Sequence, residues 1–161
     1  MLVRRTVAVL AAMVVMVFGG SAAAQASPRP APVAVTTQSE AGPAGAQASC
    51  TKRNVSHYDV WTNRTWPADW VCGNRAGAPL YGCASFISAC GVIGWIDTSS
   101  SWFVCWGRGA QHSGGNNIWY YTQGDRSALG EGGRQGWGFI PAVDVWTSTD
   151  PWPGMTECNI P

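Results

Sequence analysis

The 161-residue chain has little charge of either sign. Only 12% of its residues are Asp, Glu, Lys or Arg, and its formal net charge is +1. Binding to nucleic acid or to an anionic membrane needs clustered positive charge, so the composition argues against both partners. Beyond residue 50 the chain is poor in residues that favour long helices, and no segment there repeats its apolar residues with helical period. A coiled coil, a helical bundle and a large α/β enzyme are therefore disfavoured.

Motifs for catalysis and for metal binding are also missing. The only histidines are His57 and His112, and no serine stands in a G-x-S-x-G elbow. Zinc sites use closely spaced Cys or His pairs, and neither C-x2-C nor H-x3-H occurs. We therefore predict a non-catalytic protein without metal or cofactor. His57, two residues before Asp59, leaves a small hydrolase as the weakest of the functional alternatives.

Residues 1–26 are typical of a secretory signal peptide. Arg4 and Arg5 form the charged start, residues 6–18 are apolar, and Ala24-Gln25-Ala26 matches a cleavage site. The alternative is an uncleaved membrane anchor. We predict cleavage, a secreted protein and no membrane contact afterwards. Without the two arginines the chain has eight Lys and Arg against nine Asp and Glu, a net charge of −1.

Residues 27–49 are rich in Pro, Ala, Ser, Gln and Gly and show no hydrophobic period. Such a segment does not bury enough apolar area to offset the entropy of ordering it. We predict a disordered linker, with a short propeptide as the alternative. The remaining residues, 50–161, form the predicted disulfide-bonded β domain.

All six cysteines lie in this last part of the chain. An even number of cysteines in an exported protein predicts three disulfides, for which fifteen connectivities exist. A short loop closed by Cys83 and Cys90 and a clasp formed by Cys158 are both compatible with the spacing. The cysteines are Cys50, Cys72, Cys83, Cys90, Cys105 and Cys158.

Short β-favouring runs alternate with Gly, Asn, Asp and Ser clusters, which is typical of a small all-β domain. In the run 102–106, alternation places Trp102, Val104 and Trp106 on one side of the strand. Phe103 and Cys105 then face the other side. The predicted strands are 58–62, 79–81, 92–96, 102–106, 118–122, 137–140 and 143–146.

Three segments of this region match a known sequence signature. Residues 136–142 read GWGFIPA, residues 118–121 read IWYY after a Gly-Asn loop, and residues 78–81 read APLY before the Val92-Ile93-Gly94 turn. In these motifs the chain resembles the bacterial Src-homology-3 domain family, in the variety found in small secreted proteins of actinobacteria. The resemblance implies a small Src-homology-3-like β-barrel over about residues 78–147, stabilised by disulfides and preceded by an N-terminal extension.

The chain departs from the family pattern in three places. The polar loop between Thr122 and Gly136 is long, three cysteines interrupt the barrel region, and residues 50–77 have no counterpart. The resemblance also implies a peptide-binding groove. Its tyrosine, tryptophan and proline transfer to Tyr81, Trp119 and Pro141, with Tyr121 beside them. The alternative is that these side chains belong to the core.

Ten tryptophans are too many for the core of so small a domain, so some are expected at the surface, where rigid rings suit binding. We therefore interpret the protein as a secreted, monomeric binding module for cell-wall peptide or polysaccharide. The alternative is a secreted ligand or inhibitor of an extracellular enzyme, presenting residues 107–117 or 123–134. The sequence does not identify the ligand.

Overall fold

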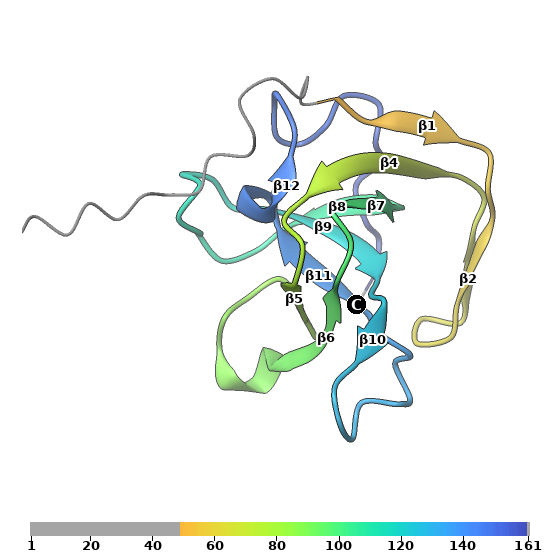
Figure 1. The fold of residues 1–161 in the computed structure, drawn as a ribbon, viewed down its shortest axis with the longest axis vertical. Helices are drawn as coiled ribbons and strands as arrows, with labels where there is room; N and C mark the ends of the chain where they lie inside the picture. Colours follow the sequence, from red (N-terminus) through yellow and green to blue (C-terminus); the bar gives the residue numbers. More distant parts are fainter. Residues whose placement is uncertain (1–48, 161) are drawn as a thin grey trace, which may run out of the picture. The chain divides into compact units, whose positions relative to one another are not determined.

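The protein is described from a computed structural model, which places residues 49–160 (Figure 1). The predicted signal peptide and, apart from Ser49, the predicted linker lie outside the described residues. Residues 49–160 contain β-strands and two single-turn 3-10 helices, η1 (Ser88–Cys90) and η2 (Ala142–Asp144), but no α-helix. The all-β prediction is thus confirmed. No helix within this range is long and apolar enough to cross a bilayer.

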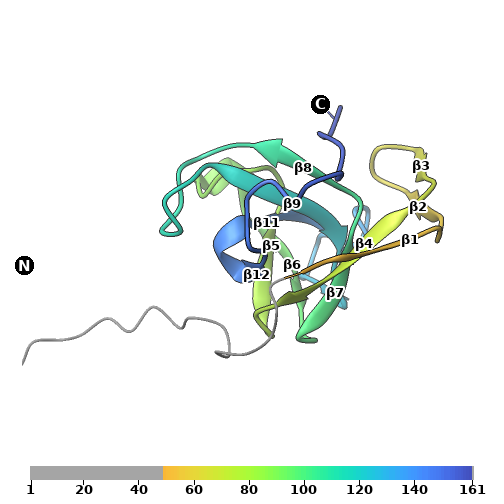
Figure 2. The ribbon, with the colours of Figure 1, turned by 90° about the horizontal axis from the view of Figure 1, so that it is seen from above.

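The first sheet has four strands and is built around a strand that the sequence pattern did not predict. This strand, β4 (Asp69–Asn74), carries Asp, Gly and Asn, which are depleted in strands. Its pairing with three other strands overrides that propensity, and β1, β4 and β7 lie side by side in Figure 2. The antiparallel partners are β1 (Thr51–Arg53), β7 (Ser100–Phe103) and β12 (Val145–Trp146).

The second sheet has six antiparallel strands and contains the segments that carry the family resemblance. Its order is β10 (Arg126–Ser127), β6 (Val92–Ile96), β5 (Ala78–Tyr81), β11 (Trp137–Pro141), β9 (Ile118–Gln123) and β8 (Cys105–Arg108). The predicted strands 92–96 and 118–122 correspond to β6 and β9. The sheet runs from an edge at β10 to an edge at β8 and does not close on itself. The predicted barrel over residues 78–147 is therefore not confirmed.

A separate hairpin joins β2 (His57–Asp59) to β3 (Arg64–Trp66) and corrects the predicted strand 58–62. The strand ends at Asp59 because this buried carboxylate accepts hydrogen bonds from the backbone N–H groups of Trp61 (2.9 Å) and Thr62 (3.3 Å). Such a bond pattern closes a turn. The chain reverses there and returns as β3.

The predicted strand 102–106 is also corrected, because it breaks at Val104 into β7 and β8. The interruption shifts the alternation of the side chains by one residue. Phe103 and Trp106 consequently pack in one core cluster, whereas Trp102, Val104 and Cys105 pack in the other. Similarly, the predicted strand 143–146 is a strand only in its last two residues, after η2.

The six cysteines form three disulfides, as predicted. Cys83–Cys90 closes a short loop, and Cys105–Cys158 ties the end of the described chain to β8. Cys50–Cys72 joins the start of β1 to β4. Three disulfides in a chain of this size are typical of proteins in an oxidising extracellular environment.

The aromatic side chains divide between core and surface, as the count of tryptophans predicts. Trp66, Trp119 and Trp137 are buried, whereas Trp61 is 52% exposed. The other six tryptophans are partly exposed. Several of these rings therefore border solvent, where they are available for contact with a ligand.

Candidate functional site

The predicted groove residues Tyr81, Trp119 and Pro141 lie together on the second sheet. The rings of Tyr81 and Trp119 meet edge-to-face with centroids 5.7 Å apart. Pro141 on β11 is the register partner of Trp119 on β9. The family signature thus brings together the three residues that the resemblance implies.

These residues do not form an open groove, because a phenylalanine covers them. Phe86 lies in the Cys83–Cys90 loop, with its ring centroid 4.8 Å from that of Trp119 and 5.2 Å from that of Tyr81. Trp119 is fully buried, and its indole N–H donates to the carbonyl of Ala110 (2.9 Å). Phe86 and Ile87 are exposed at this point, and Tyr81 is partly exposed beside them. The two cysteines flanking an aromatic residue are the sequence signal for this cover.

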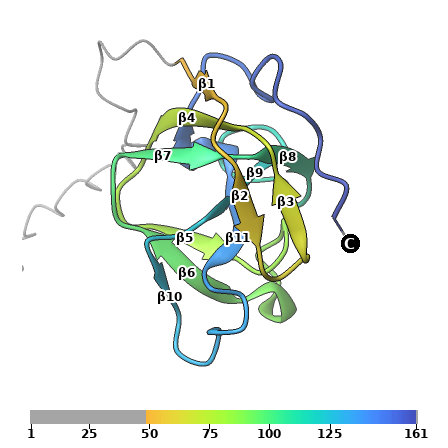
Figure 3. The ribbon, with the colours of Figure 1, turned by 90° about the vertical axis from the view of Figure 1, so that its right-hand side faces the viewer.

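Tyr121 lies two residues further along β9 and is covered by the N-terminal extension. Its hydroxyl donates to the carboxylate of Asp59 (2.9 Å), and its ring lies 6.2 Å from that of Trp66. Both partners belong to the β2–β3 hairpin, which is drawn in front of β11 in Figure 3. Burial and the Asp59 charge raise the pKa of Tyr121 well above its usual value. Residues 50–77, which have no counterpart in the family, thus cover the second part of the expected groove.

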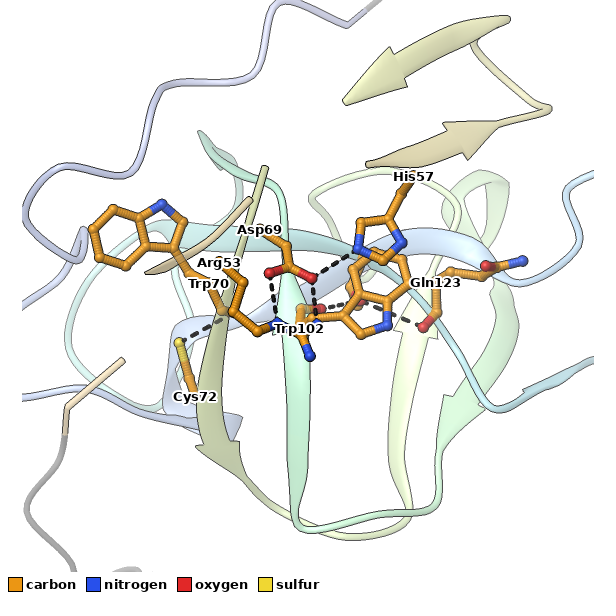
Figure 4. A network of polar contacts seen from close by, with 8 residues as sticks. Arg53, His57, Asp69, Trp70, Cys72, Trp102 and Gln123 are labelled. Atoms are coloured by element: carbon orange, nitrogen blue, oxygen red, sulfur yellow. Dashed lines mark hydrogen bonds and ion pairs between the residues drawn. The ribbon is translucent and has the colours of Figure 1, made fainter. Parts of the chain in front are cut away.

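His57 forms an ionic network with Asp69 instead of with Asp59 (Figure 4). The fully buried Asp69 carboxylate accepts hydrogen bonds from His57 Nε2 (2.7 Å) and Arg53 Nε (2.9 Å). Burial acts to raise the pKa of Asp69, but Arg53 and His57 outweigh it through hydrogen bonds and charge, so the pKa lies below its usual value. The network fastens the hairpin to the first sheet.

The His57 ring also stacks on Trp102, with centroids 3.8 Å apart. A hydrolytic triad needs a nucleophile within hydrogen-bond reach of the histidine. Within residues 49–160 no hydroxyl or thiol forms a hydrogen bond with His57. In the same part of the chain no three His, Cys, Asp or Glu side chains are grouped to hold a metal ion.

An open pocket of about 160 Å³ lies on the other face of β4 from the Asp69 network. In Figure 4 the Trp70 ring points away from the Asp69 carboxylate. We call this hollow the tryptophan pocket, because Trp66 and Trp70 supply its two rings. Its lining residues are Lys52, Trp66, Pro67, Ala68, Trp70, Val104, Gly154 and Thr156.

The tryptophan pocket is assembled from segments far apart in the sequence. Lys52 on β1 is the register partner of Trp70 on β4. Residues 154–156 supply another part of the lining and are held against β8 by Trp106. The indole N–H of Trp106 donates to the Met155 carbonyl (2.9 Å), and its backbone N–H donates to the Thr156 carbonyl (3.1 Å). Sequence reasoning missed this site, although two closely spaced tryptophans just before Cys72 were a signal.

Two disulfides fasten the walls of the tryptophan pocket. Cys50–Cys72 joins β1 to β4 two residues from Lys52 and two from Trp70. Cys105–Cys158 joins the residue after Val104 to the segment that carries Thr156. Covalent cross-links this close to a hollow limit how far its walls move, so the pocket is largely pre-formed.

Comparison with known proteins adds no family: no family model matches the chain, and no curated protein or solved structure is significantly similar to it.

Proposed function

We propose that the β domain is a secreted, non-catalytic binding module that recognises cell-wall peptide or polymer through the tryptophan pocket. The observation that carries this proposal is the open, disulfide-braced pocket lined by Trp66 and Trp70. Trp70 is partly exposed, whereas Trp66 is buried, and a partly exposed tryptophan supplies large contact area at low entropic cost. A pocket that is already formed binds without the cost of ordering its walls.

The size of the pocket limits what enters it. Its volume of about 160 Å³ is close to that of an apolar cavity of roughly 150 Å³ that holds one benzene ring. Sites for whole small molecules are larger, about 300–1,000 Å³. The pocket therefore takes a single group that projects from a longer ligand, as expected for recognition of a polymer or a peptide.

The resemblance to the bacterial Src-homology-3 family supports a binding role for residues 78–147. We propose that the chain is a divergent, monomeric relative in which the N-terminal extension and the Cys83–Cys90 loop occupy the family's binding face. Tyr81, Trp119, Tyr121 and Pro141 then serve mainly as core. The ligand contacts move to the tryptophan pocket, which the extension and the C-terminal segment create.

The proposal is tested by sedimenting the purified protein with insoluble bacterial cell wall. We expect the wild type to be retained and Trp70→Ala to stay in the supernatant. Ala68→Leu, which fills the pocket while both rings remain, is expected to behave like Trp70→Ala. The matched control is Trp95→Ala, because Trp95, like Trp70, is partly exposed with a cation over its ring but lies on β6. Equal retention of wild type and both pocket variants would refute the proposal.

A second candidate function rests on the Cys83–Cys90 loop. Phe86 and Ile87 are 49% and 62% exposed on this disulfide-closed loop, which is the arrangement of a rigid presenting loop. A secreted ligand or inhibitor of an extracellular enzyme uses such a loop. This function would be favoured if the protein co-elutes stably with a secreted hydrolase and Ile87→Asp abolishes the co-elution. Loss of cell-wall retention in Trp70→Ala would instead favour binding through the tryptophan pocket.

A further inference from the structure

The two rings of the tryptophan pocket each carry a cation. Lys52 Nζ lies 5.9 Å from the ring centroid of Trp70, and the Arg64 guanidinium lies 4.3 Å from that of Trp66. Within residues 49–160 neither cation forms an ion pair with a carboxylate. Both side chains are exposed, but the Arg64 guanidinium donates to the Asn159 carbonyl (3.1 Å), so Lys52 is the cation more available to a ligand.

Two other arginines stacked on tryptophan in this protein have a counter-charge. Arg126 over Trp95 pairs with Asp97 (2.9 Å). Arg134 over Trp61 lies near Glu131 (3.9 Å). Arg108 over Trp106 has no ion pair within residues 49–160, so what distinguishes Lys52 is that it lines the apolar hollow.

No acidic residue lines the tryptophan pocket. Asp69, next to the lining residues Ala68 and Trp70, is held by Arg53 and His57 on the opposite face of β4. The exposed Glu157, next to Thr156, does not line the pocket. An unpaired cation in the lining, Lys52, favours a ligand that combines an apolar group with an anionic one. Because the chain as a whole is nearly neutral, this preference belongs to the pocket and not to the surface in general.

The polar groups of the pocket distinguish a peptide from a sugar. Apart from the indoles, only Lys52 and Thr156 among the lining residues have polar side-chain atoms, and the Trp66 indole nitrogen is buried without a partner. A sugar ring that enters an apolar hollow brings several hydroxyl groups that need hydrogen-bond partners. An aliphatic side chain needs none, so the lining favours a peptide side chain.

Building on the proposed function, we infer that the tryptophan pocket binds the carboxyl-terminal residue of a peptide. The apolar side chain of that residue enters the hollow, and its free carboxylate pairs with Lys52. A terminal residue carries both groups on one carbon atom, so a single residue satisfies the hollow and the cation at once. The ligand class is a peptide with an apolar last residue and a free carboxyl end.

The test titrates the purified, disulfide-bonded protein with two peptides, acetyl-Ala-Ala-Leu with a free carboxylate and the same peptide as its amide. We expect the indole N–H resonances of Trp66 and Trp70 to shift, and the amide to bind about ten-fold more weakly or worse, because charge-assisted hydrogen bonds are lost. The comparison uses the wild type alone, so it does not depend on the folding of any variant.

Variants then locate the effect. Lys52→Met is expected to weaken binding of the carboxylate peptide toward that of the amide. The matched control is Arg108→Gln, since Arg108 also lies over a tryptophan, Trp106 (5.5 Å), without lining the pocket. Loss of binding in the control alone would place the carboxylate elsewhere and overturn the inference.

Equal affinity for the two peptides, or tighter binding of glucuronic acid than of the carboxylate peptide, would also overturn the inference. In that case cell-wall retention that still depends on Trp70 would leave the proposed function standing. Retention that does not depend on Trp70 would remove the proposed function, and with it the reason for a peptide ligand at this pocket.

Discussion

Two aromatic regions of this protein are built from the same kinds of residue but differ in what covers them. In the closed cluster, Phe86 lies on Tyr81 and Trp119. In the tryptophan pocket, the Trp70 ring lies against Gly154, which has no side chain to cover it. A Cβ atom added to Gly154 would lie 3.3 Å from the ring. Disulfides stand beside both regions.

The difference lies in what the disulfides hold in place. Cys83–Cys90 closes the loop whose Phe86 covers the closed cluster, whereas Cys50–Cys72 and Cys105–Cys158 fasten the segments that line the pocket. The comparison teaches that an aromatic motif alone does not identify a binding site. Whether another residue covers the aromatic rings determines whether they belong to the core or form a binding site. Four substitution or pH experiments test this difference between the two regions.

The largest expected effect is on stability when each region loses its central ring. Trp119→Ala removes a fully buried ring and is expected to lower the free energy of unfolding by about 3–5 kcal/mol. Trp70→Ala removes a ring that is only partly buried, so about 1–2 kcal/mol is expected. Urea unfolding followed by circular dichroism measures both. Similar losses for the two variants would show that the regions do not differ as core and site.

The next effect comes from opening the disulfides. Replacing Cys105 and Cys158 by serine releases a sequence separation of 53 and is expected to lower the free energy of unfolding by about 4 kcal/mol. Replacing Cys83 and Cys90 releases a separation of only 7, and the expected loss is about 2.5 kcal/mol. Only the first change frees a pocket wall, so only it is expected to abolish cell-wall retention. Retention by the Cys105/Cys158 variant would contradict a pocket held open by that bridge.

A smaller effect is expected when the cover is removed. Phe86→Ala takes away a half-exposed ring and is expected to cost about 1 kcal/mol. It also brings solvent to Trp119, so exchange of the Trp119 indole N–H, followed by nuclear magnetic resonance, is expected to accelerate. The control is Ile87→Ala, which lies in the same loop but has no ring contact with Trp119. An unchanged exchange rate in Phe86→Ala would mean that another group covers the cluster.

The smallest effect at neutral pH concerns the Asp69 network, which lies on β4 next to Trp70 and, in the described part of the chain, has no hydrogen bond to the closed cluster. The pKa of Asp69 is lower in the folded state than the value of about 3.9 expected when unfolded. Its stabilising contribution is therefore complete above that value and is lost as the pH falls through the folded-state pKa. Acid is expected to shift the Trp70 indole resonance before that of Trp119. Asp69→Asn serves as the control, because this variant has no carboxyl group to titrate there.

The sequence predicted the strands whose side chains suit a sheet by themselves. The runs at 92–96 and 118–122 are rich in β-branched and aromatic residues, and both are strands. The pairing of the cysteines was compatible with the spacing but not determined by it. β4 was not predictable, because Asp69, Gly73 and Asn74 are poor strand formers and only the neighbouring strands hold them extended.

The candidate site was less predictable than the fold. The motifs that carry the resemblance pointed to Trp119. The two cysteines around Phe86 were a signal for its cover, but no local pattern indicates that the β2–β3 hairpin covers that face. The tryptophan pocket joins residue 52, residues 66–70 and residues 154–156, and their approach depends on pairings between distant segments. Such long-range contacts leave no periodic trace in the sequence of any one segment.

The loop between Cys83 and Cys90 has a practical use as a site for inserting foreign peptides. Its ends leave neighbouring antiparallel strands, β5 and β6, and are joined covalently, so a longer insert between them would not alter the register of the sheet. If Phe86 is kept, the apolar surface beneath stays sealed from water. The domain would then serve as a display scaffold in oxidising media.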